Sequence, residues 1–209
     1  MNKKITNIIK IFEKKYPDPE TALNYNSEFE LLIATILSAQ TTDKQVNKVT
    51  SNLFSKYNTP EDFAKLEPEE LEKEIQSIGL YRNKSKYIIK TANKLIEDFN
   101  GEVPDTRKDL IQLSGVGRKT ANVVLSCAFT KDAFPVDTHV YRLANRIGLV
   151  KADKVREVED GLMDVVPKKY WSKMHHWLIF HGREVCKAQN PLCKKCKIKK
   201  FCDYYQKNY

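Results

Sequence analysis

The sequence predicts an all-α protein, and three features of its 209 residues support this prediction. Apolar residues recur at intervals of three and four along most of the chain, which is the spacing of an amphipathic helix. Strict alternation of apolar and polar residues, which is typical of strands, is almost absent, and no hairpin dipeptide joins two alternating runs. Residues that favour helix N-termini precede several of the periodic segments. We therefore expect about ten short helices.

Most of the expected helices in the first half of the chain have a recognisable start or stop. Pro17 and Pro19 end the first helix, and Thr41-Thr42-Asp43 supplies N-cap chemistry for a later one. Proline suits the first helical position, because its missing N–H is not needed there. The expected segments are 2–16, a buried apolar helix over 29–39, 43–57, two short helices that begin at Pro60 and Pro68, and 84–99.

The second half of the chain predicts a further series of helices around a glycine-rich turn. Asp105-Thr106 caps the first of them, and Pro135-Val136-Asp137-Thr138 opens another that Gly148 ends. No internal repeat or Gly/Ser linker is present, so composition alone sets no domain boundary. The expected segments are 107–113, about 117–130, 138–147, 153–166 and 169–182, followed by a cysteine-rich end.

The charge balance favours a polyanionic partner. Lys and Arg together number 36 against 27 Asp and Glu, which gives a net charge of +9. Nucleic acid is the simplest such partner, and a generally basic protein is the alternative. No run of about 18 apolar residues occurs, so we expect no membrane span. The N-terminal sequence lacks the long apolar segment of a secretory signal, so we expect a cytoplasmic protein.

The stretch Leu113 to Asn122 combines two glycines with the start of a helix. Gly115 and Gly117 permit a tight turn whose amides point outward. The helix that follows adds unpaired N–H groups and the positive end of its dipole, which together can bind a phosphate. Lys119 lies in the first turn of that helix, close to whatever is bound.

Lys119 and Asp137 form a candidate catalytic pair. A lysine amine can attack a sugar C1′ and form a Schiff base. A carboxylate beside it can stabilise an oxocarbenium-like sugar and help activate the amine. The helix from Lys119 rises about 16 Å, and residues 131–137 span up to about 24 Å when extended, so the chain can fold back. The alternatives are a lysine that only neutralises phosphate and an ordinary N-cap aspartate.

Four of the five cysteines lie in the last 24 residues, spaced as C-x6-C-x2-C-x5-C. Their crowding and the odd total favour a metal site over disulfides. Structural zinc sites usually show two close ligand pairs, and only one is present here, so an iron–sulfur cluster is favoured over zinc. Interleaved lysines predict a basic loop that faces phosphates. The expected ligands are Cys186, Cys193, Cys196 and Cys202, and Cys127 is expected in the core.

Four motifs, which follow one another along the chain in the family's order, resemble the endonuclease III family of DNA glycosylase/lyases. They are Leu-Ser-Gly-Val-Gly-Arg-Lys-Thr-Ala-Asn-Val-Val from Leu113, Val-Asp-Thr-His-Val from Val136, Ser-Ala-Gln-Thr-Thr-Asp from Ser38, and the cysteine spacing. They cover nearly the whole chain, from residue 38 to 202. One departure is Ser114, where the family commonly has proline, and it removes no chemical group.

The resemblance implies two helical domains with DNA in the cleft between them. One is a six-helix barrel over 22–132, with a helix-hairpin-helix near 107–130. The other joins 1–21 to 133–209 and carries a structural [4Fe–4S] cluster. The implied partner is double-stranded DNA with damaged bases or abasic sites, and the implied state is a monomer.

The resemblance also implies a mechanism and a set of site residues. Lys119 attacks C1′ of an oxidised pyrimidine nucleotide, Asp137 assists, and β-elimination nicks the strand 3′ to the lesion. Gln40 pairs with the orphaned base and Leu80 fills the gap that the flipped base leaves. The remaining implied DNA contacts are Leu113, Gly115, Gly117, Arg118, Thr120, Lys187, Lys194 and Lys195.

Three other functions stay open from the sequence. Mismatch glycosylases of similar build tend to replace the lysine, and the adenine-specific ones carry a further C-terminal domain. A non-catalytic helix-hairpin-helix module would bind abasic DNA without cutting it and would not require Asp137. An iron–sulfur electron carrier would not need the hairpin or the +9 charge. The four histidines are expected to be structural or to contact phosphate.

Overall fold

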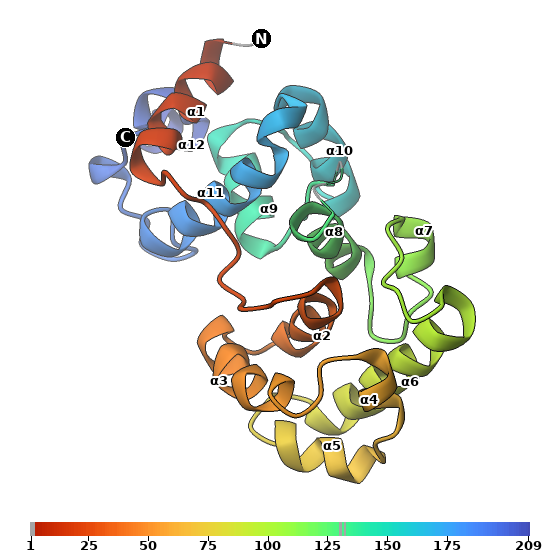
Figure 1. Ribbon diagram of the computed structural model, residues 1–209. Helices are drawn as coiled ribbons and strands as arrows, with labels where there is room; N and C mark the ends of the chain where they lie inside the picture. The colour runs from red at the N-terminus through yellow and green to blue at the C-terminus, as the bar shows by residue number, and fades with distance from the viewer. Residues whose placement is uncertain (1–2, 130, 132) are drawn as a thin grey trace. The chain divides into compact units, whose positions relative to one another are not determined.

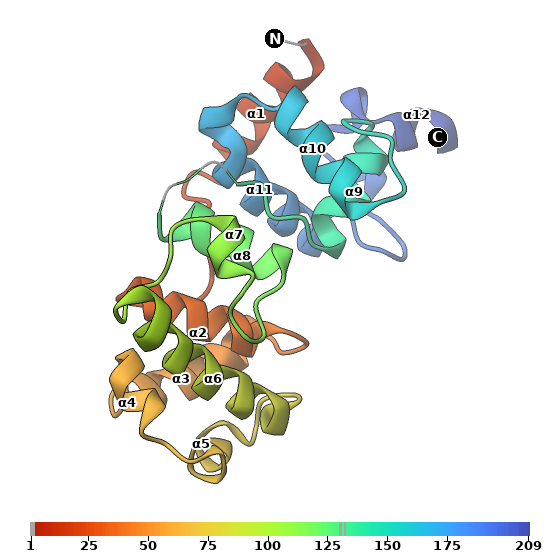
Figure 2. The same cartoon turned by 90° about the vertical axis from the view of Figure 1, so that its right-hand side faces the viewer.

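The computed structural model describes residues 3–129, 131 and 133–209. Every regular element within these ranges is helical, and no strand occurs in them, which confirms the all-α prediction. The chain divides into two compact units, and each is coloured along the chain in Figures 1 and 2. We call Thr21–Lys131 the central unit, and Met1–Glu20 with Asp132–Tyr209 the terminal unit.

The central unit is built around α2, which is buried on almost every side. Ser27 caps this helix, and its hydroxyl accepts a 3.1 Å hydrogen bond from the amide of Glu30. Residues 29–37 are all buried, as expected for a helix that is apolar all round. Helices α3, α6 and α8 pack against it. The helices of this unit are α2 (Glu28–Ser38), α3 (Asp43–Phe54), α4 (Pro60–Ala64), α5 (Pro68–Ile75), α6 (Tyr81–Phe99), α7 (Arg107–Leu110) and α8 (Arg118–Cys127).

The expected N-caps of the central unit are present. Thr42 accepts from the amide of Gln45 at the start of α3, and Thr106 accepts from Asp109 at the start of α7. Helices α4 and α5 begin at Pro60 and Pro68, as predicted, and both have capping boxes. These side chains satisfy amides that have no partner inside the helix.

Most helix boundaries lie within two residues of the predictions, and α6, α3 and α7 each have one boundary that differs by three. Helix α6 begins at Tyr81 rather than residue 84, because a left-handed residue, Leu80, precedes it and turns the chain directly into the helix. Helix α3 ends at Phe54, three residues before the predicted end, and α7 ends at Leu110 in a tighter turn. Helix α8 ends at Cys127, and the predicted end at Thr130 lies outside the described residues, as do residues 2 and 132.

The terminal unit joins the first helix of the chain to its last third. Phe12 of α1 contacts the ring of Trp177 in α11, and the indole of Trp177 donates a 2.9 Å hydrogen bond to the carbonyl of Tyr16. Helix α9 packs against α10, α11 and α12. The elements are α1 (Lys3–Lys15), α9 (Thr138–Ile147), α10 (Val155–Val165), a 3-10 turn (Lys168–Tyr170), α11 (Trp171–Glu184), two more 3-10 turns (Cys193–Lys195 and Lys199–Phe201) and α12 (Asp203–Asn208).

Two predicted signals set the ends of α9. The side chain of Asp137 caps its N-terminus, and Gly148 ends it with a left-handed φ of 77°. Within the described residues, no helix combines the length and apolar character that crossing a membrane requires.

Candidate nucleic-acid interface and cysteine pocket

Helices α7 and α8 form a hairpin, and buried side chains anchor its turn to the core. Leu113 and Val116 are buried, so the turn between them is pinned to the core while its glycines face solvent. The hydroxyl of Thr91 on α6 donates a 2.9 Å hydrogen bond to the carbonyl of Ser114. Serine at this position therefore leaves the turn tied to α6 through its backbone.

Glycine occurs at the two hairpin positions for different structural reasons. Gly115 has φ 76°, and a Cβ there would lie 3.1 Å from the Cβ of Tyr87, so both backbone and packing require glycine. Gly117 has φ −91°, which any residue adopts, and a Cβ there would meet no atom within 4 Å. Its place as the N-cap of α8 favours glycine over alanine. The exposed backbone at Gly117 also leaves room for a ligand to approach closely.

Lys119 is exposed in the first turn of α8, two residues after Gly117. Arg118 and Thr120 on either side are partly exposed. Gly117 is the N-cap of α8 and has no capping side chain, so the first amides of this helix have no side-chain acceptor from the cap. The turn thus offers backbone donors, the positive end of a helix dipole and a primary amine to an anion.

Asp137 belongs to the terminal unit, whereas Lys119 belongs to the central unit. The Asp137 carboxylate is half-buried, and its Oδ1 accepts a 2.8 Å hydrogen bond from the amide of Val140. The N-cap interpretation of Asp137 is therefore correct. It is compatible with a chemical role, because capping fixes the rotamer of the carboxylate.

Gln40 and Leu80 occupy two neighbouring turns of the central unit. Both have left-handed backbones, with φ of 57° and 59°, which is uncommon for residues other than glycine. Both side chains are exposed, and Leu80 is 55% exposed although it is apolar. The amide of Gly79 donates a 3.3 Å hydrogen bond to the hydroxyl of Thr41, which joins the two turns. Strained backbone under an exposed apolar side chain is typical of a functional position.

The four clustered cysteines line one pocket of the terminal unit. Its other walls are mostly apolar or aromatic and come from α9, α11 and the C-terminal segment. The lining includes Cys186, Cys193, Cys196, Cys202, Ile147, His181, Ile198, Tyr204 and Tyr205. The structure therefore brings together all four predicted ligands, and Cys127 lies outside this pocket in α8.

An arginine and a histidine lie beside two of the sulfur atoms. The Nη1 of Arg146 lies 3.7 Å from the Sγ of Cys186, and the same guanidinium donates to the carbonyls of Lys187 and Ala188. The Nε2 of His181 lies 3.3 Å from the Sγ of Cys196. A cation such as the Arg146 guanidinium stabilises negative charge on a nearby sulfur.

Burial of the thiols favours their protonated form when no metal is bound. Burial raises the pKa of Cys196 to about 11. It also raises the pKa of Cys193 and of Cys202. Within the described residues, no group of three His, Cys, Asp or Glu side chains is arranged to hold a metal ion. The four thiols that share the pocket are a donor set that suits either an iron–sulfur cluster or a zinc ion.

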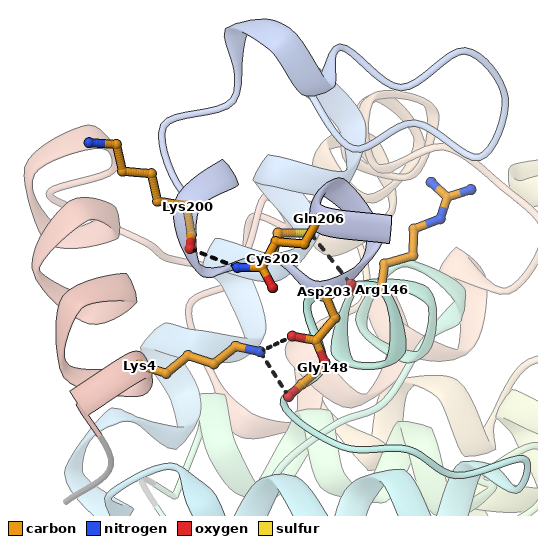
Figure 3. Close-up of polar contacts among 7 residues, drawn as sticks. All are labelled: Lys4, Arg146, Gly148, Lys200, Cys202, Asp203 and Gln206. Atoms are coloured by element: carbon orange, nitrogen blue, oxygen red, sulfur yellow. Dashed lines mark hydrogen bonds and ion pairs between the residues drawn. The ribbon is translucent and has the colours of Figure 1, made fainter. Parts of the chain in front are cut away.

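Hydrogen bonds from Lys4, near the N-terminus, hold the segment after Cys202, near the C-terminus (Figure 3). The ammonium of Lys4 donates to Asp203 Oδ1 at 2.7 Å and to the carbonyl of Gly148 at 3.2 Å. A Cβ at Gly148 would lie 1.9 Å from Asp203 Oδ2, so glycine is required there by packing as well as by φ. The thiol of Cys202 donates to the carbonyl of Arg146 at 3.4 Å. Helix α1 thereby holds Asp203, the residue that follows the last cysteine.

Three predicted phosphate-contacting lysines, Lys187, Lys194 and Lys195, are exposed around the cysteine segment. Two of the histidines make contacts within the protein: His139 Nδ1 lies 3.1 Å from Arg142, and His175 Nδ1 lies 2.8 Å from the carbonyl of Pro135.

Two residues that support these sites were not predicted. The periodicity predicts a helix that begins at Lys84, but no signal in the sequence marks this lysine as buried. Arg146 lies in the last turn of α9, where a basic residue ordinarily serves the helix dipole. Both act through backbone carbonyls of segments distant in sequence.

Comparison with known proteins gives consistent matches. The family model of HhH-GPD superfamily base excision DNA repair proteins matches residues 33–168. The chain is 50% identical to endonuclease III of Rickettsia conorii over 201 residues, which is 96% of each chain. It is 52% identical to endonuclease III of Bacillus subtilis over 193 residues, covering 92% of this chain and 88% of that one. A solved trapped endonuclease III–DNA covalent intermediate, the estranged-adenine complex, matches with a TM-score of 0.92 and 50% identity, covering 99% of both chains.

Proposed function

The chain belongs to the endonuclease III family of HhH-GPD base excision DNA repair proteins, and on this premise we propose that it is a bifunctional DNA glycosylase and abasic-site lyase. Its substrate class is duplex DNA that contains oxidised pyrimidines or abasic sites. The single observation that carries the proposal is the exposed Lys119 in the first turn of α8, two residues after Gly117. A related protein has been trapped as an endonuclease III–DNA covalent intermediate, which supports a covalent step.

The nucleophile is the amine of Lys119. As the Nζ–C1′ bond forms, the glycosidic bond breaks and the departing base takes up a proton. Opening of the sugar ring then gives a protonated Schiff base between Nζ and C1′. Loss of a proton from C2′ breaks the C3′–O bond, and the strand is cut 3′ to the abasic site.

Asp137 supplies negative charge to the same reaction. Its carboxylate stabilises the positive charge that develops on the sugar as the base leaves, and it accepts a proton from the attacking amine. The cap hydrogen bond to Val140 occupies Oδ1 and fixes the orientation of the carboxylate. Capping and catalysis therefore use one conformation of the side chain.

The hairpin and the two strained turns bind the DNA. The amides after Gly117 and the side chains of Arg118 and Thr120 hold phosphate, while the apolar residue Leu113 anchors the turn. Extrusion of the damaged base costs stacking and pairing, and Leu80 and Gln40 offset this loss. Leu80 wedges into the gap, and Gln40 hydrogen-bonds the orphaned base. Lys187, Lys194 and Lys195 add contacts to phosphate.

The four clustered cysteines hold a [4Fe–4S] cluster. Their shared pocket, its apolar walls and the nearby Arg146 fit that group. The cluster is structural and fixes the basic loop, because base removal and β-elimination transfer no electrons. In this proposal residues 22–132 form the six-helix barrel domain, and 1–21 with 133–209 form the cluster domain. The protein acts as a monomer on the DNA of the cytoplasm or nucleoid.

Borohydride trapping tests the enzymatic proposal. The parent protein and duplex DNA with one abasic site should give a covalent complex when the Schiff base is reduced. Lys119→Ala should abolish trapping, whereas Lys90→Met, which removes a positive charge from an exposed position on α6, should trap normally. Trapping by Lys119→Ala at the parent level would refute the assignment, and a non-catalytic DNA-binding module would give no trapping by any variant.

A further inference from the structure

Lys84 is a buried cation that the proposed chemistry does not use. The residue is only 4% exposed, although lysine is seldom buried. The ammonium donates hydrogen bonds to the carbonyls of Leu37 at 2.9 Å and of Ala39 at 2.6 Å. Burial lowers the pKa of Lys84 below its usual value. Placing a lysine here is costly, so the two contacts need a reason.

The ammonium of Lys84 caps the C-terminal end of helix α2. The last carbonyls of a helix have no partner within it, and a cation at that end is favourable. Leu37 and Ala39 lie at this end, and α2 has no basic residue of its own in its last turn. Ala39 directly precedes Gln40, so the bond at 2.6 Å fixes the peptide that leads into the left-handed backbone of Gln40.

The backbone of Lys84 holds the other strained turn. Its amide donates a 3.0 Å hydrogen bond to the carbonyl of Leu80, whose φ is 59°. One residue therefore contacts both turns, through its N–H on the Leu80 side and through its ammonium on the Gln40 side. Thr41 adds a second connection, because its hydroxyl accepts from the amide of Gly79.

We propose that Lys84 is a positioning residue that holds Gln40 and Leu80 in register, so that they act together when a base is extruded. The inference rests on the proposed function of these two residues. Lys84 does not touch the DNA or the reacting atoms. Its loss should impair removal of a stacked, paired base and spare the reaction of Lys119 at a site that has no base to extrude.

The test compares two substrates with Lys84→Met, which keeps the apolar stem and removes the ammonium. Under single turnover, base release from a duplex with one oxidised pyrimidine should fall about tenfold or more. Strand cleavage and borohydride trapping at a preformed abasic site in single-stranded DNA should stay within about twofold of the parent. A 2-aminopurine next to the lesion should show slower extrusion in stopped-flow fluorescence.

Two controls on α6 separate this role from charge and from stability. Lys90→Met removes an exposed positive charge from the same helix, and Ile88→Val makes a small cavity one turn beyond Lys84. Both should leave the ratio of base release to abasic-site cleavage unchanged. If Lys84→Met folds poorly, Thr41→Val removes the second connection from a half-buried site and should lower the same ratio.

The outcomes distinguish this inference from the proposed function. An equal loss on both substrates, or an unchanged ratio in a folded Lys84→Met protein, overturns the positioning role of Lys84. If Thr41→Val is used in place of Lys84→Met, an unchanged ratio of base release to abasic-site cleavage also overturns the positioning role. Failure of the parent protein to trap on abasic DNA would instead remove the proposed function, and that result is read from the parent alone.

Discussion

The carboxylate of Asp137 accepts a 2.8 Å hydrogen bond from the backbone amide of Val140, so a proposed catalytic group also caps helix α9. The two roles depend on different properties of the side chain. Capping needs an oxygen acceptor, which asparagine also provides, whereas the chemical role needs a negative charge.

Replacement of Asp137 by asparagine therefore separates stability from activity. Asp137→Asn should leave the free energy of unfolding nearly unchanged, while Asp137→Ala should lower it by about 1 kcal/mol through loss of the cap. Both variants should lose base-release activity by about a hundredfold or more. Chemical denaturation and single-turnover base release measure the two effects. Full activity in a stable Asp137→Asn protein would leave Asp137 with the capping role alone.

The two hairpin glycines should respond differently to alanine. Gly115→Ala should lower the free energy of unfolding by at least about 1 kcal/mol, because its φ is 76° and a Cβ would lie 3.1 Å from Tyr87. Gly117→Ala should lower it less, because its φ of −91° suits alanine and its Cβ would meet no atom within 4 Å, so only the modest N-cap preference for glycine is lost.

Gly117→Ala should nevertheless weaken binding to duplex DNA, because the added methyl group keeps phosphate away from the backbone amides. Urea unfolding and fluorescence anisotropy with labelled DNA measure stability and affinity. Unchanged affinity in Gly117→Ala would remove the hairpin amides from the DNA contacts.

The stability of the terminal unit should fall in acid because of His176. Burial, with a smaller contribution from neighbouring His175, lowers the pKa of His176 to about 3 from its usual 6.5. The unfolded chain then binds a proton below pH 6.5 that the folded chain does not bind until about pH 3. Stability from this group is therefore complete above pH 6.5 and is lost progressively as the pH falls towards 3, by roughly 2 kcal/mol at pH 5.

Unfolding free energies at pH 7.5 and pH 5 measure this dependence. His176→Gln should show a smaller loss between the two values than the parent, whatever its stability at pH 7.5. An identical loss in the variant and the parent would mean that His176 is not responsible for the acid sensitivity.

Cysteine substitutions should distinguish the pocket from the rest of the chain. Cys196→Ser should lose bound iron and visible absorbance and should destabilise the terminal unit, because the pocket then lacks a ligand. Cys127→Ser is the matched control, since Cys127 lies outside the pocket, and it should keep the full iron content. If the parent protein is colourless and contains bound zinc, the pocket holds zinc and not an iron–sulfur cluster.

Local signals in the sequence predicted much of the fold. Thr42, Pro60, Pro68, Thr106, Asp137 and Gly148 stand at helix ends where their side-chain chemistry places them. The start of α6 was wrong by three residues, because Leu80 adopts a left-handed backbone that its residue type disfavours. Only contacts with a distant segment can impose such a backbone, and periodicity does not report them.

The supporting residues were beyond prediction for the same physical reason. A buried lysine at position 84 and an arginine that holds the carbonyls of Lys187 and Ala188 depend on contacts between segments far apart in sequence. The pattern of residues shows which groups can react or ligate. It does not show which groups hold them in place.

Peptide mapping of the borohydride-trapped complex tests the central claim most directly. After nuclease and protease digestion, mass spectrometry should find the reduced sugar adduct on the peptide that contains Lys119, attached to its Nζ. An adduct on the N-terminal amine or on another lysine, with Lys119 unmodified, would contradict the account.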